Sequence, residues 1–327
     1  MPRKSVLCCV FIAAVLLAGC AATGVGLVDE TEKPVAATAE PGRYRVALVM
    51  KTLTNPFFVK MEQGARKAED EFGVGLIVRT GAQETSIAQQ IQIVEDLILQ
   101  DVDAIVIAPG SSVELVGVLK KARDAGIVIV NIDNRLDQAE CQRLGLSGVP
   151  FISVRNDEGA YLSAKVIAEA AKKPCEAIIV EGIRDAENAQ LRLAGAQKAF
   201  GEYPDIRIVA SETANWKIDE AYELAKKLFA RFPNAKLAFC ANDMMALGVV
   251  QFLKEANRKD VLVAGFDNLD EVGGEIRDGW ISATIDQQAD LQGYKGVETA
   301  VRMLDGQPVD AETYVPVKVI TKGEAKP

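Results

Sequence analysis

Histidine is absent from this 327-residue sequence. Without imidazole, the chain has neither the Ser-His-Asp and Cys-His catalytic devices nor any zinc or iron site that uses histidine ligands. The chain also has fewer basic than acidic residues: 37 Lys and Arg and 46 Asp and Glu give a formal charge of −9. A field of this sign repels phosphate backbones and argues against nucleic acid as a partner.

The sequence also has no apolar run long enough to cross a bilayer, which takes about 20 residues. The run at 6–18 is shorter, follows a short basic start, and leads into Leu-Ala-Gly-Cys at 17–20. This pattern predicts a signal peptide over 1–19. Its end resembles a bacterial lipobox, which implies that cleavage leaves Cys20 as a lipidated N-terminus. An ordinary signal peptide that contains a cysteine is the alternative.

Residues 20–42 show no sustained apolar period and are rich in small and helix-breaking residues, so we expect a flexible tether there. Three cysteines follow, Cys141, Cys175 and Cys240, and an odd number cannot complete a disulfide framework. Cys240 lies in an apolar run, where a buried inert thiol is expected. Whether Cys141 and Cys175 pair is left open, and their spacing is not of the metal-binding type.

From residue 43 onward, short β-branched runs alternate with longer stretches of helical period, which predicts an α/β fold with parallel sheets covered by helices. The expected strands are 44–50, 75–79, 104–108, 128–132, 177–181, 207–211, 236–241, 261–266 and 282–285. The expected helices are 56–72, 86–100, 113–125, 157–172, 188–200, 218–232, one that starts near 244, and 291–304. Because 133–150 breaks the alternation, we expect two α/β lobes with the ligand site in the groove between them.

In parallel sheets, ligands bind outside the carboxyl ends of the strands. The side chains expected there mix cations, carboxylates, amides and aromatic rings: Lys51, Asn55, Phe57, Phe58, Asp133, Asn134, Arg135, Arg192, Asn215, Trp216, Asn242, Asp243, Asp267, Asn268, Asp286 and Gln287. Carboxylates accept hydroxyl hydrogens, Arg and Asn donate to oxygens, and aromatic faces cover C–H groups. This chemistry suits a neutral polyhydroxylated ligand.

An enzyme is the weaker interpretation of the same residues. Two carboxylates could hydrolyse a glycosidic bond, but Asp133 and Asp267 are expected beside cations and amide donors that keep them ionised, so neither is suited to act as a general acid. The sequence has no G-x-x-x-x-G-K-[ST] loop, no G-x-G-x-x-G after a strand and no C-x-x-C pair. We therefore expect no catalysis, no cofactor and no metal.

Four ordered motifs carry a resemblance to a known family. They are KTLTNPFF at 51–58, NDMMALG at 242–248, GFD at 265–267 and ATIDQ at 283–287. With them, residues 43–321 resemble the periplasmic sugar-binding proteins of bacterial ABC transporters, in the branch of the ribose-binding and D-allose-binding proteins. The resemblance implies a type I periplasmic binding protein that closes on a monosaccharide, as a monomer, and presents it to a membrane permease from the periplasm or cell surface.

The resemblance also implies two Rossmann-like lobes joined by a three-crossing hinge near Arg155, Gln287 and Val317. The first lobe would comprise 43–154 plus 288–316, and the second 155–287 plus 317–323. The implied ligand residues are Lys51, Asn55, Phe57, Phe58, Asp133 and Asn134 from the first lobe, and Arg192, Trp216, Asn242, Asp267 and Gln287 from the second lobe and hinge.

Three positions bear on the identity of the sugar. Ribose-type members usually have a small hydroxyl residue at the position of Lys51, whereas D-allose-type members have lysine. Ribose-type members have Arg at the position of Asn134, and losing it removes up to five N–H donors. Phe58, implied to form an aromatic sandwich with Trp216, replaces the tryptophan common in D-allose-type members.

Structural roles compete with these assignments. Phe57 and Phe58 could pack the start of their helix, Arg192 could be solvated, and Lys51 could pair with Asp133. Either Asn242 or Asp243 could cap the helix that follows, and we expect Asp243 to do so.

Two other functions use the same lobes. A sugar-sensing protein that feeds a chemoreceptor or sensor kinase would have the same site. A repressor of the lactose type would need a DNA-binding segment of about 50 to 60 residues ahead of the lobes, where this chain has its signal and tether.

Overall fold

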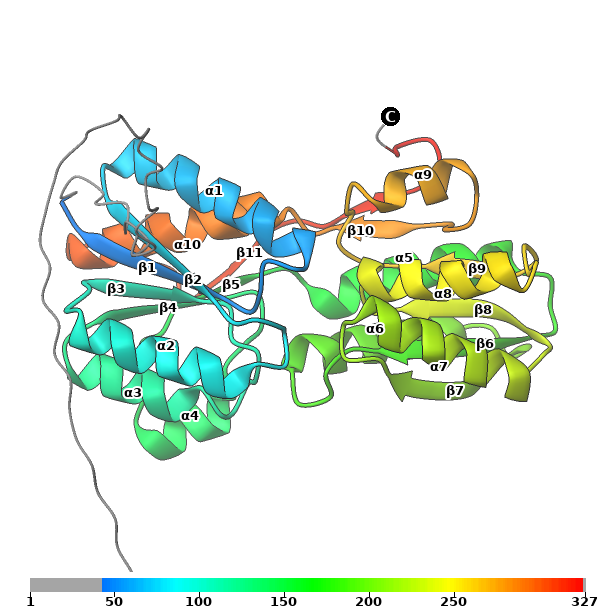
Figure 1. Cartoon of the computed structure of the whole chain (residues 1–327), viewed down its shortest axis with the longest axis horizontal. Coiled ribbons are helices and arrows are strands. Elements are labelled where there is room, and N and C mark those ends of the chain that lie inside the picture. The colour runs from blue at the N-terminus through cyan, green and yellow to red at the C-terminus, as the bar shows by residue number, and fades with distance from the viewer. Residues whose placement is uncertain (1–42, 326–327) are drawn as a thin grey trace, which may run out of the picture. The chain divides into compact units, whose positions relative to one another are not determined.

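The computed structural model describes residues 43–325 (Figure 1). The expected signal peptide, the lipidation of Cys20 and the tether at 20–42 lie outside these residues and remain predictions. Within 43–325, strands and helices alternate along most of the chain, and the predicted α/β fold is confirmed. No helix in this part of the chain combines the length and apolarity needed to cross a bilayer.

The first lobe is built on a six-stranded sheet in which all neighbouring strands are parallel, in the order β11-β5-β4-β3-β1-β2. The strands are β1 (Arg45–Met50), β2 (Gly75–Thr80), β3 (Ala104–Ile107), β4 (Val128–Ile132), β5 (Phe151–Ser153) and β11 (Glu312–Tyr314). The helices of this lobe are α1 (Pro56–Phe72), α2 (Ile87–Leu99), α3 (Val116–Asp124), α4 (Gln138–Leu144) and α10 (Ala289–Leu304).

Helices cover both faces of this sheet, with α1 and α10 on one side and α2 and α3 on the other (Figure 1). Strand β1 shows why its sequence is almost wholly apolar. Val46 and Leu48 pack in the same core cluster as α1, whereas Ala47 and Val49 pack with α2 and α3. Since alternate side chains face opposite sides of a strand, a strand buried on both faces needs apolar residues at every position.

The second lobe has a four-stranded parallel sheet in the order β7-β6-β8-β9. Its strands are β6 (Cys175–Glu181), β7 (Ile206–Thr213), β8 (Ala235–Cys240) and β9 (Leu262–Ala264), and its helices are α5 (Asn156–Ala170), α6 (Glu187–Gly201), α7 (Ile218–Arg231), α8 (Asp243–Glu255) and α9 (Val272–Arg277). A bridge from Ala264 to Ala283 connects this sheet to an antiparallel pair, β10 (Thr284–Asp286) and β12 (Lys318–Ile320). The sheets of both lobes are parallel as predicted, and the antiparallel pair is an addition at the edge of the second.

The chain passes between the lobes more than once. After β10 it returns to the first lobe as α10 and β11, and β12 then pairs with β10 of the second lobe. These pairings agree with a first lobe of 43–154 plus 288–316 and a second lobe of 155–287 plus 317–323. The boundaries and the three-crossing hinge remain predictions.

Helix α1 forms where the sequence predicts it. The Asn55 side chain accepts a hydrogen bond from the Phe57 N–H, Pro56 occupies the first turn, and Gly73 ends the helix with a left-handed φ of 63°. The short elements α4, α9, β5, β11 and β12 are not among the predicted ones.

The cysteines that the structure describes are all free and buried. Cys141 lies in α4 of the first lobe and Cys175 begins β6 of the second, so the disulfide left open by the sequence is not formed.

Helices α1 and α10 cross at glycines. A Cβ added to Gly64 would lie 1.7 Å from the backbone oxygen of Asp290, and one added to Gly293 would lie 2.0 Å from that of Met61. Both contacts are with backbone, which has little room to move, so the two helices approach more closely than any side chain would allow.

We expect Gly64→Ala to lower the free energy of unfolding by about 1 to 3 kcal/mol, because the new methyl group must push the two backbones apart. The matched control is Gly117→Ala in α3, where an added Cβ meets nothing within 4 Å. That control should be neutral or gain about 0.4 to 1 kcal/mol. Urea denaturation of both variants measures the difference, and equal stabilities would contradict the close crossing.

Candidate ligand-binding site

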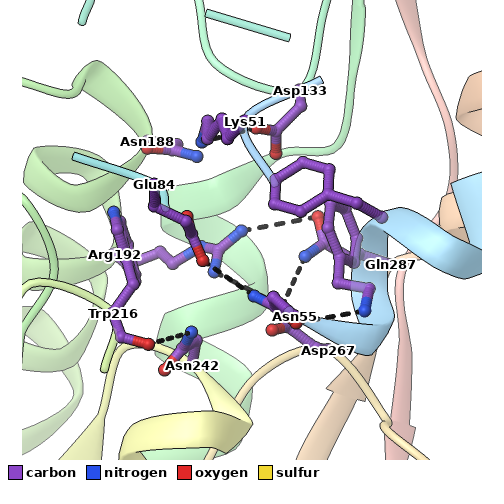
Figure 2. Close-up of a pocket in the computed structure, with 12 residues that line it drawn as sticks. Lys51, Asn55, Glu84, Asp133, Asn188, Arg192, Trp216, Asn242, Asp267 and Gln287 are labelled. Atoms are coloured by element: carbon purple, nitrogen blue, oxygen red, sulfur yellow. Dashed lines mark hydrogen bonds and ion pairs between the residues drawn. The ribbon is translucent and has the colours of Figure 1, made fainter. Parts of the chain in front are cut away.

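A polar pocket lies at the carboxyl ends of strands from both lobes (Figure 2). Its lining residues are Lys51, Asn55, Phe57, Phe58, Glu84, Asp133, Asn188, Arg192, Trp216, Asn242, Asp267 and Gln287. Ten of the eleven residues predicted from the sequence are among them, and that each binds ligand remains a prediction.

Asn134 is the predicted residue that does not line the pocket. Its side chain is fully buried, its amide nitrogen donates to the Pro109 carbonyl oxygen at 3.1 Å, and its amide oxygen accepts from the Asn188 N–H at 3.3 Å. The side chain is thus occupied by protein partners. In this structure the Asn134 side chain makes a contact between the lobes, and its implied contact with ligand stays a prediction.

Glu84 and Asn188 line the pocket but were not predicted. Glu84 comes soon after the end of β2. A polar residue after a strand is the signal by which the sequence could have identified it as a pocket residue. Glu84 accepts a hydrogen bond from the Asn55 amide at 2.9 Å, and burial raises its pKa. Asn188 is the second residue of α6, and the sequence gives no sign that this helix begins at the pocket.

Each lobe supplies its own buried ion pair. In the first lobe, Lys51 Nζ lies 2.8 Å from Asp133 Oδ2. In the second lobe, Arg192 Nη1 lies 3.6 Å from Asp267 Oδ1, and all four side chains are only 3% exposed. The expected structural pairing of Lys51 with Asp133 is therefore present. Pairing reduces the large cost of removing such charges from water.

Arg192 is held in place from several sides. Its Nε donates to the Asn156 amide oxygen at 2.9 Å, its Nη1 donates to the Ala241 carbonyl at 2.8 Å, and its guanidinium lies 3.7 Å from the centre of the Phe266 ring. Burial lowers the pKa of Arg192, although an arginine remains a cation in proteins. The alternative of a solvated Arg192 is wrong.

Asp267 departs from the expectation that its neighbours keep it ionised. Burial raises its pKa well above the usual value, although the charge of Arg192 and a 2.6 Å hydrogen bond from the Gln287 amide act in the opposite direction. Water exclusion is therefore the stronger effect here. The Asp267 carboxyl oxygens can accept hydrogen bonds from hydroxyl groups.

Two aromatic rings from opposite lobes line the pocket. Phe58 belongs to the core of the first lobe and packs edge-on against Phe57, with centroids 5.0 Å apart. Trp216 is 5% exposed, and its indole nitrogen has no hydrogen-bond partner among the described residues. Buried indole N–H groups normally have a partner, so this donor is available to a ligand.

The backbone is strained at three pocket residues that end strands or follow them. Asp133, Trp216 and Asp267 have φ values of 63°, 67° and 127°, a region that disfavours side chains. Such conformations cost about 1 to 3 kcal/mol each and persist where the surrounding structure imposes them. They aim these side chains into the pocket.

The cap of α8 corrects a prediction. Asn242, not Asp243, caps the helix: its side-chain oxygen accepts from the Met245 N–H at 2.9 Å. Asp243 is fully buried and accepts from the Thr284 hydroxyl at 2.7 Å and the Leu269 N–H at 3.0 Å. It thereby fixes the loop after β9, which carries Asp267. Burial raises the pKa of Asp243 to about 6.

Two parallel-sheet lobes that meet over a polar pocket, with paired charges and aromatic faces, define a two-lobed solute-binding protein. Residues 46–308 match the family described as the periplasmic binding protein domain, and the chain belongs to this family. As a member, it is a solute-binding protein and not an enzyme.

Relatives and solved structures extend over most of the chain. The D-ribose/D-allose-binding protein of Pseudomonas aeruginosa is 40% identical over 288 residues, covering 86% of this chain and 90% of the relative. The D-allose-binding periplasmic protein of Escherichia coli is 33% identical over 257 residues, covering 78% and 83%. A periplasmic solute-binding protein of an ABC transporter from Actinobacillus succinogenes, solved with bound D-allose, has a TM-score of 0.82 and 36% identity, covering 88% of this chain and 99% of its own.

We expect Asp243→Asn to reduce the pH dependence of stability. A carboxyl whose pKa is raised on folding stabilises the protein below its unfolded value and loses that contribution as the pH rises through the folded value. The wild type should therefore lose stability relative to Asp243→Asn between about pH 4 and pH 7, on either side of the folded pKa of about 6. Urea denaturation of both proteins across this range gives the difference. A difference independent of pH would contradict the raised pKa.

Proposed function

We propose that this chain is the lipid-anchored solute-binding component of an ABC importer. Its ligand would be a monosaccharide, an aldopentose or aldohexose such as ribose or allose, held by closure of the two lobes. The observation that carries this proposal is the composition of the pocket, which is lined by two ion pairs, amides and aromatic side chains from both lobes.

The side chains that line the pocket support a sugar as the ligand. The polar groups of the pocket suit hydroxyls, because carboxylates accept hydrogen bonds and side-chain amides both donate and accept them. Phe58 and Trp216 would cover the C–H faces of the ring.

The names of the relatives support the same class of ligand. Relatives are named for D-ribose and D-allose, and a structural neighbour binds D-allose. Lys51, with lysine at a position where D-allose-type members also have it, makes D-allose the first sugar to test. D-ribose is the second.

Closure would couple binding to transport. A ligand that bridges Asp133 of the first lobe and Arg192 of the second stabilises the closed form through contacts available only there. The closed monomer would then dock on a membrane permease. Cys20 would keep the protein at a membrane, in the periplasm or on the cell surface.

The alternative function is a sensor that feeds a chemoreceptor or kinase. It would share the pocket, and a neighbouring permease gene would favour transport.

A thermal-shift screen tests the proposal. The protein that starts at Cys20 is heated with pentoses, hexoses and polyols, one at a time. A sugar present at 100 times its Kd stabilises the folded state by about 2.7 kcal/mol, so D-allose or D-ribose should raise Tm by several degrees. No shift across the whole panel would contradict the proposed function.

Asp267→Ala should weaken sugar binding by about 30-fold or more, because hydroxyl and amide groups lose their partner in a dry pocket. Asp267→Asn keeps one oxygen acceptor and tolerates the positive φ of 127° better than alanine, so it should bind more tightly than Asp267→Ala. Titration calorimetry measures both, with Tm of the free variants as the folding control. Unchanged affinity in Asp267→Ala would remove Asp267 from the site.

A further inference from the structure

The N-terminus of α6 in the second lobe takes its hydrogen-bond acceptors from the first lobe. The residue before this helix, Ala186, supplies no side-chain cap. Instead, Ser112 Oγ accepts from the Glu187 N–H at 3.1 Å, and Asn134 Oδ1 accepts from the Asn188 N–H at 3.3 Å. A helix start leaves four N–H groups without partners inside the helix, so these contacts form a cap provided by the opposite lobe.

The two acceptors are held ready within the first lobe. Ser112 Oγ lies 3.4 Å from Asn134 Oδ1, and the Asn134 amide nitrogen donates to the Pro109 carbonyl at 3.1 Å. Both side chains are at most 5% exposed. Their orientation therefore does not depend on α6, and only the arrival of α6 is needed to complete the cap.

A third residue of the first lobe adds to this contact. Arg135 Nε lies 3.3 Å from the Glu187 carboxylate, and Arg135 Nη1 lies 2.6 Å from Glu312 of β11. Two backbone N–H groups and one carboxylate in the first turn of α6 thus all have first-lobe partners. This contact between the lobes therefore combines one ion pair, between Arg135 and Glu187, with two hydrogen bonds from backbone N–H groups to neutral side chains.

The capped turn also brings one side chain to the pocket. Asn188 is 3% exposed, lines the pocket, and its amide oxygen has no hydrogen-bond partner among the described residues. Figure 2 shows its amide beside Lys51, at the edge of the pocket. A buried amide oxygen without a partner is costly, which makes this amide a candidate for contact with a bound hydroxyl.

We propose that Ser112 and Asn134 are positioning residues for closure: they cap α6 across the lobes only when the lobes meet, place Asn188 at the sugar, and set how long the closed complex lasts. This inference rests on the proposed function. It also gives Asn134, which does not line the pocket, a role. Because the cap exists only in the closed form, its energy shifts the equilibrium toward closure without any contact with the sugar.

The test compares two adjacent serines. Ser112→Ala removes an acceptor for the opposite lobe, whereas Ser111→Ala, the matched control, removes a hydroxyl that accepts from Val113 and Glu114 N–H groups of its own lobe. Stopped-flow fluorescence with D-allose and D-ribose gives association and dissociation rates, and heating the free proteins gives Tm.

We expect Ser112→Ala to release sugar about two- to thirty-fold faster, the range that loss of a helix N-cap covers. Its association rate and its free-protein Tm should stay at the wild-type values. Ser111→Ala should release sugar at the wild-type rate. Asn134→Ala, which removes the other acceptor of the cap, should also release sugar faster than the wild type.

Wild-type release from Ser112→Ala, or equally fast release from Ser111→Ala, would overturn the inference. A second arm needs no sugar: dyes on Lys67→Cys and Lys226→Cys, exposed positions on the two lobes, report the closed fraction of the free protein by single-molecule energy transfer. Ser112→Ala should lower that fraction, and an unchanged fraction would overturn the inference. If the wild type binds no sugar, the proposed function fails, and this second arm still decides the inference.

Discussion

The structure depends on how charge is compensated inside a pocket that excludes water. An isolated buried ion is very costly, and removing one partner of a buried pair is strongly destabilising. Here each lobe contains its own buried ion pair, which is Lys51 with Asp133 in the first lobe and Arg192 with Asp267 in the second. Each pair lies within one lobe, so the lobes can separate without breaking either ion pair.

The fold places these pairs because parallel strands end at the same edge of a sheet. Asp133 follows β4 and Asp267 follows β9, while Arg192 reaches the pocket from α6 and is held there by Asn156 and Ala241. Positive φ values at Asp133 and Asp267 turn these residues out of the direction of their strands. Burial then acts on the carboxyls and raises the pKa values of Asp267 and Asp243, the latter holding the loop that carries the former.

Contacts between the lobes divide into two kinds. The pocket side chains face a ligand, whereas Ser112, Asn134 and Arg135 face the first turn of α6. The second kind uses ordinary helix chemistry, since a helix start always needs acceptors. Placing those acceptors in the other lobe makes an otherwise local cap depend on tertiary structure.

The sequence by itself determined the α/β class, the position of α1, and ten of the residues that line the pocket. These follow from signals local to the chain: apolar runs, capping residues, and polar residues just after strands, together with motifs that match a family. The tertiary structure alone decided that Asn134 caps α6 rather than lining the pocket, that Asn242 rather than Asp243 caps α8, that Asn188 reaches the site, and that burial outweighs the neighbours of Asp267. Each of these depends on distance and on water exclusion between segments far apart in the chain, which no local pattern records.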